Sequence, residues 1–78
     1  MFVVVNVGRE IRENSNGNNP LERLLELSRI YDVDYWSLGR GYDFITTVEN
    51  LGDATELVRR INTERGYIAK VSTDRPGR

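Results

Sequence analysis

The sequence predicts an α+β fold with the element order βαββαβ, in which a four-stranded antiparallel sheet carries two helices on one face. Three observations predict this fold. A β-branched run opens the chain at Phe2–Val7, two amphipathic helical segments follow cap signals near Asn19 and Asn50, and a glycine turn joins two strand-like runs between them. We expect residues 1–74 to form a single domain and residues 75–78 to form a C-terminal tail.

Composition narrows the chemistry that the chain can perform. It has 78 residues, no cysteine, no histidine and a formal net charge of −1. A chain of this length buries only about 60% of the surface that its unfolded form exposes, so a monomer would be marginally stable. Without cysteine, the chain can form neither disulfides nor thiolate metal sites. Without histidine, it also lacks the commonest metal ligand and general base. We expect no metal and no cofactor; chemistry would come from Asp, Glu, Tyr, Arg or an imported cofactor.

The apolar start of the chain does not predict an export signal or an anchor. Residues 1–7 are too few and lack the basic flank of a signal peptide, and no later run approaches the length of a membrane span. The prediction is a cytoplasmic protein without a membrane partner.

The first strand is apolar on both faces. Phe2 and Val4 point one way, while Val3, Val5 and Val7 point the other. A polar, asparagine-rich loop over residues 8–19 follows. It could be a functional lid or a mobile connection.

The first helix has a clear beginning. Asn19 supplies a cap acceptor, Pro20 suits the first helical position, and Glu22 completes a capping box. The expected apolar face comprises Leu21, Leu24, Leu25 and Ser28, broadened by Leu27 and Ile30.

The second half of the chain predicts a hairpin, a helix and a last strand. Residues 33–38 and 42–49 have strand character on either side of the glycine turn. Asn50, Gly52 and Asp53 open the second helix, in which Asp53 and Glu56 repeat the cap pattern. Gly66 is placed as its stop, and Tyr67–Ser72 forms the last strand. The apolar stripe of this helix comprises Ala54, Leu57, Val58 and Ile61.

This order is the split βαβ arrangement of ferredoxin-like domains, with both helices on one side of the sheet. The other face would keep half of the first strand and alternate residues of the hairpin exposed. Hiding even about 400 Å² of apolar surface is worth roughly 10 kcal/mol before association costs. We therefore predict a homodimer or larger homo-oligomer in which two sheets face each other as a dimeric α/β barrel.

Residues 33–49 (VDYWSLGRGYDFITTVE) also resemble the strand, Gly-x-Tyr-Asp turn and strand of stand-alone GYD-type domains. The segment is similar to the effector-binding domain of Lrp/AsnC regulators, and both families are dimeric α/β barrels. Here Gly39 is followed by Arg40 and Gly41 before Tyr42 and Asp43, one residue more than in those families. The resemblance implies a stand-alone sensor or partner module without a DNA-binding unit.

In the regulators, small effectors such as amino acids bind around this turn. The resemblance therefore implies a ligand site at Gly39, Arg40, Gly41, Tyr42 and Asp43, with Trp36 beside it. Glycine amides and Arg40 could hold a carboxylate, and Asp43 could accept from an ammonium. Alternatively, the glycines serve a bulged turn, Asp43 accepts backbone N–H groups, and Trp36 and Tyr35 are packing residues.

The leading hypothesis is a non-enzymatic, homo-oligomeric module that binds a small molecule such as an amino acid. The first alternative is a small cofactor-free enzyme, a monooxygenase or isomerase, with Trp36, Tyr35 or Asn6 in the barrel cavity. The second, nucleic-acid binding on the open sheet, requires a basic, aromatic-rich face that the YIAKVS strand lacks, so we expect no nucleic-acid partner.

Overall fold

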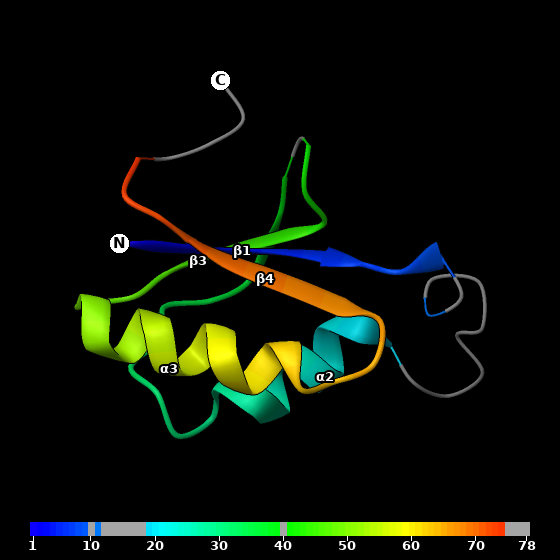
Figure 1. Cartoon of the computed structure of the whole chain (residues 1–78), viewed down its shortest axis with the longest axis horizontal. Helices are drawn as coiled ribbons and strands as arrows, with labels where there is room; N and C mark the ends of the chain where they lie inside the picture. Colours follow the sequence, from blue (N-terminus) through cyan, green and yellow to red (C-terminus); the bar gives the residue numbers. More distant parts are fainter. Residues whose placement is uncertain (10, 12–18, 40, 75–78) are drawn as a thin grey trace.

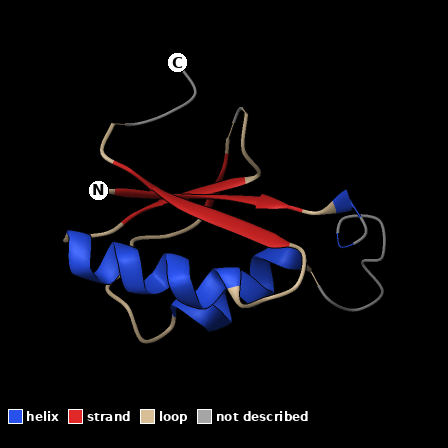
Figure 2. Ribbon diagram, in the orientation of Figure 1, coloured by secondary structure: helices blue, strands red, loops and turns tan. Residues whose placement is uncertain are grey.

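The computed structural model describes residues 1–9, 11, 19–39 and 41–74. Its elements are β1 (Phe2–Val7), α2 (Pro20–Ser28), β2 (Ser37–Leu38), β3 (Phe44–Thr47), α3 (Leu51–Asn62) and β4 (Tyr67–Ser72). The strands form one antiparallel sheet in the order β2-β3-β1-β4. Both helices lie on the same side of it (Figures 1 and 2). This is the predicted α+β, ferredoxin-like arrangement.

The core lies between the sheet and the helices. Val3, Val5 and Val7 of β1 point into it, where they meet Leu57 and Ile61 of α3. All of these side chains are buried, and Leu57 and Ile61 are completely so. The alternation predicted for β1 is confirmed, because the other face of this strand lies outside the core cluster.

Asparagine side chains begin both helices. Asn19 accepts from the backbone N–H of Leu21, 3.0 Å away, and Pro20 is the first helical residue, as predicted. Asn50 accepts from the N–H of Asp53 at 2.8 Å, so α3 begins at Leu51 and Asp53 lies in its first turn. The cap of α3 is therefore Asn50, and the predicted cap pattern of Asp53 and Glu56 is wrong, because Asp53 is already the third helical residue.

The ends and faces of the helices depart from the predicted pattern in two places. The buried residues of α2 are Leu24, Leu27 and Ser28, whereas Leu25 and Ile30 are exposed. The helix ends at Ser28, before Ile30 can join its stripe. Helix α3 ends at Asn62, and Gly66 adopts a φ of 88° in the turn that leads into β4. The glycine therefore serves the turn and does not stop the helix.

The strand predicted over residues 33–38 is interrupted by a β-bulge. Val33 bridges to Val48, but Ser37 pairs with Ile45, so three residues on one side face two on the other. Only Ser37–Leu38 is a regular strand. The extra residue reverses the alternation, which turns both Val33 and Trp36 toward the core. A period-two pattern cannot reveal such an insertion, because each half of the segment still alternates.

The sheet face away from the helices, which we call the open face, is less apolar than predicted. Val4 and Ile45 pair with each other across the strands and are only 3% and 4% exposed, although neither belongs to the core cluster. Their neighbours on the same face include Lys70, which pairs with Val4 from β4. The face contains Phe2, Val4, Asn6, Ser37, Ile45, Thr47, Ile68, Lys70 and Ser72. It therefore has an apolar centre with polar surroundings.

The outer edge of β4 is covered by a side chain from α3. Asn62 Oδ1 accepts from the backbone N–H of Ala69 at 2.7 Å, and Asn62 Nδ2 donates to the Ala69 carbonyl at 3.1 Å. The amide group thus makes the pair of bonds that another strand would make. At this position it protects the edge against strand addition.

Most of the loop predicted over residues 8–19, Arg40, and the tail at residues 75–78 lie outside the described residues. Within the described part of the chain, no helix is both long and apolar enough to cross a membrane.

Candidate functional site

The turn before β3 contains most of the predicted site residues. Gly39 and Gly41 are exposed, and Arg40 between them is outside the described residues. A Cβ added to Gly39 would lie 1.6 Å from Cε2 of Tyr42, so the tyrosine ring occupies the space that a side chain would need. Gly41 has a φ of 76°, which L side chains rarely adopt. Gly39 therefore leaves room for the Tyr42 ring, and Gly41 allows the backbone path of the turn.

Asp43 attaches this turn to β1. Its Oδ2 accepts from the backbone N–H of Val7 at 2.6 Å, and its own N–H donates to the Val5 carbonyl at 2.9 Å. The carboxylate thus satisfies a β1 donor just beyond the last β1–β3 pair. The alternative interpretation, in which Asp43 accepts a backbone N–H, describes this contact, although the donor belongs to β1 and not to the turn.

Trp36 does not line the turn, because its indole is buried in the core and only 6% exposed. Its Nε1 donates to Ser28 Oγ at 2.7 Å, and the Ser28 hydroxyl in turn donates to the Leu24 carbonyl. The buried indole N–H therefore has a partner, and the residue ties the bulge to α2. These contacts are those of a packing residue.

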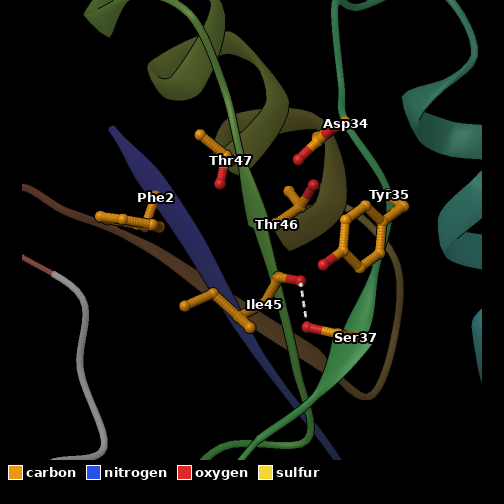
Figure 3. Close-up of a pocket in the computed structure, with 7 residues that line it drawn as sticks. All are labelled: Phe2, Asp34, Tyr35, Ser37, Ile45, Thr46 and Thr47. Atoms are coloured by element: carbon orange, nitrogen blue, oxygen red, sulfur yellow. Dashed lines mark hydrogen bonds between the residues drawn. The ribbon is translucent and has the colours of Figure 1, made fainter.

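A pocket of about 100 Å³ lies beside the bulge (Figure 3). Asp34 and Tyr35 enter it from the bulge, while Phe2 and Thr47 approach from β1 and β3. Its lining comprises Phe2, Asp34, Tyr35, Ser37, Ile45, Thr46 and Thr47. A carboxylate and several hydroxyls therefore converge over an apolar floor. The sequence indicated Tyr35 as a cavity residue but did not indicate Asp34, Ser37 or Thr47, because their convergence depends on the bulge.

One polar atom beside this pocket is buried without a partner. Thr46 is 3% exposed, and among the described residues its Oγ1 has no hydrogen-bond partner. A buried hydroxyl in this state costs free energy that a nearby ligand or water could recover. Thr46 pairs with Val3, whose side chain points into the core, so this hydroxyl lies on the helix side of the sheet.

Two acidic side chains meet on the surface at the far end of β3. The pKa of Glu49 is raised because its carboxyl shares a hydrogen bond with Asp32 and lies close to that residue's charge. Asp53 adds a smaller repulsion. The folded chain therefore holds a proton on this pair at a pH where the unfolded chain has released it.

The Glu49→Gln variant is expected to have a flatter stability profile in mild acid. Between the ordinary and the raised pKa, the folded state binds more protons than the unfolded state, so parent stability falls as pH rises through this window. Removing the Glu49 charge removes that fall. Thermal unfolding from about pH 4 to about pH 7 should show a smaller decline than in the parent or in Asp74→Asn, a control that also deletes one exposed carboxylate. Equal slopes in all three proteins would contradict the shared proton.

Among the described residues, no three Asp or Glu side chains converge in a way that could hold a metal ion. The fold and the site together define a small ferredoxin-like α+β domain with a glycine turn before β3 and a small polar pocket on its open face. Comparison with protein families, characterised proteins and solved structures finds no match to this chain. The resemblance to GYD-type and Lrp/AsnC domains therefore stays a prediction, which the structure accommodates only at the level of fold.

Proposed function

We propose that this chain is a homodimeric module that pairs through the open face of its sheet and binds a small molecule without catalysing a reaction. The observation that carries the proposal is the apolar centre of that face. Val4 and Ile45 lie outside the core cluster, and α2 and α3 are both on the other side of the sheet (Figure 2). A second copy would pack on the exposed apolar side chains around this centre and extend the limited core of a 78-residue chain.

The exposed apolar side chains around this centre indicate where the second copy would gain most. Ile68 on β4 is 67% exposed and Tyr35 beside the bulge is 63% exposed. Val4 and Ile45 are already covered by their neighbours, so burial of Ile68 and Tyr35 supplies most of the new apolar contact. Sheets that pack face to face interdigitate such side chains at a separation of about 10 Å.

The turn is the proposed ligand site. Gly39 and Gly41 are exposed, so their backbone lies within reach of a small molecule. Arg40 between them would pair with a carboxylate, and the Asp43 carboxylate at the end of the turn would accept from an ammonium. The chemistry fits an amino acid or a similar zwitterionic metabolite.

Within a single chain, the pocket beside the bulge is too small to enclose a small-molecule substrate. Cavities that surround a small-molecule substrate usually measure about 300–1,000 Å³, and the pocket beside the bulge holds about 100 Å³. Trp36, a polar candidate of the enzyme hypothesis, is occupied by Ser28 in the core. We therefore place the enzyme alternative behind the binding module.

A thermal shift measurement with a panel of amino acids and related metabolites tests the ligand. A true ligand at 100 times its Kd should stabilise the protein by about 2.7 kcal/mol. The Arg40→Ala variant should lose that gain, whereas Arg29→Ala, which removes an exposed arginine after α2, should retain it. Failure of every panel member to stabilise the parent, or equal stabilisation of both variants, would contradict the proposed site.

A further inference from the structure

The pocket beside the bulge has the character of a site for one small cation. Asp34 supplies a carboxylate, and Tyr35, Ser37 and Thr47 supply hydroxyl oxygens around it (Figure 3). No cationic side chain of the described residues lines it. Its volume of about 100 Å³ is too small for most metabolites but suits the end of a side chain. An ammonium group would be attracted by the carboxylate and could donate to several hydroxyls at once.

The chain carries one lysine, Lys70, against ten arginines. Lys70 lies in the middle of β4 on the open face, and it is exposed. Among the described residues Lys70 has no ion-pair partner. Its long aliphatic stem can cross apolar surface while the ammonium reaches further.

The register of the sheet places Lys70 and the pocket at the same level but at opposite edges. Lys70 pairs with Val4, Val4 pairs with Ile45, and Ile45 pairs with Ser37 of β2. If two copies face each other about a two-fold axis parallel to the strands, β4 of each copy lies across from β2 of the other. Each Lys70 then points toward the partner's pocket, and Val4 comes to face Ile45.

From this register we infer that a second copy of the chain seats the ammonium of its Lys70 in the pocket formed by Asp34, Tyr35, Ser37 and Thr47. The inference rests on the proposed dimer and specifies its geometry. The two-fold axis repeats the contact, so each pocket receives the partner's Lys70.

Two further observations favour this arrangement over other modes of association. Asn62 occupies the outer edge of β4 at Ala69, which opposes pairing by strand addition. Among the described residues, Lys70 lies at one edge of the open face and Asp34 lies in the pocket beside the other edge, so the face is complementary to itself. Nucleic acid would instead require an excess of positive charge on this face.

Charge reversal tests the contact. Asp34→Lys and Lys70→Glu should each weaken the dimer at least about tenfold in Kd, because each places like charges together at both pockets. The double variant Asp34→Lys, Lys70→Glu should recover most of that affinity, since the pair is restored with opposite polarity. Sedimentation equilibrium gives Kd for all four proteins, and circular dichroism confirms that each is folded.

Acylation of the single lysine provides an independent readout. An amine-reactive ester should modify Lys70 at least about tenfold more slowly in the parent dimer than in Asp34→Asn, with the Met1 amine as an internal reference. A parent that is monomeric would overturn the proposed dimer. A different set of results would overturn the Lys70 contact alone. In that case Ile68→Asp dissociates the parent dimer, the charge-reversal variants remain dimeric, and Lys70 is acylated equally slowly in the parent and in Asp34→Asn.

Discussion

The Ile68→Asp variant is expected to be a folded monomer. Ile68 is 67% exposed in the single chain, so an aspartate there remains in water when the chain is alone. In the proposed dimer the same carboxylate would be buried without a partner, and the two-fold axis makes this happen twice. One unpaired buried charge costs about 3–5 kcal/mol, so Kd should rise by more than about a hundredfold. Light scattering would then give the monomer mass.

Ile30→Asp is the matched control for this substitution. Ile30 is 71% exposed and follows the end of α2, away from the open face. The same change in polarity and charge at this position should leave the dimer intact. Val4→Asp is a poorer probe, because Val4 is 3% exposed in the single chain and a charge there would also destabilise the monomer. Dissociation of both isoleucine variants, or of neither, would contradict the proposed interface.

The Trp36→Ala variant is expected to lose about 3–5 kcal/mol of unfolding free energy, the usual cost of removing a large core side chain. It leaves a cavity beside Ser28 and removes the donor to its hydroxyl. Small domains have about 0.05–0.15 kcal/mol of stability per residue, so this loss is a large part of the total for 78 residues. Urea unfolding followed by circular dichroism measures it.

Tyr35→Ala tests the neighbouring aromatic position. Tyr35 is exposed, so its removal should change stability by no more than about 0.5 kcal/mol. Both substitutions are best compared in the Ile68→Asp background, where self-association does not contribute to the measured stability. If Trp36 served a ligand and not the core, the two variants would have similar stabilities.

Local signals in the sequence predict most of the fold. The β-branched composition of Phe2–Val7 and the alternation of Tyr67–Ser72 predict the first and last residues of both strands correctly. Asn19 and Pro20 fix the start of α2 because cap geometry depends on neighbouring residues alone. The order of the elements then leaves few topologies, of which the ferredoxin-like one is observed.

The site was less accessible to prediction because it depends on pairing between distant residues. The bulge arises where the Val33–Val48 bridge and the Ser37–Ile45 pair differ by one residue in register. That offset buries Trp36 and gathers Asp34, Tyr35 and Ser37 at one pocket, although a simple strand pattern suggests neither result. The Gly-Arg-Gly-Tyr-Asp motif predicted a ligand site at the turn but did not predict that Asp43 accepts a hydrogen bond from β1.

The molar mass of the parent chain in solution distinguishes the proposed dimer from a monomer. Light scattering coupled to size-exclusion chromatography, repeated over a wide range of protein concentrations, separates a stable dimer from a monomer. We predict a mass twice the 9.0 kDa of the chain at the higher concentrations, or a larger multiple. A mass of 9.0 kDa at every concentration would contradict the account.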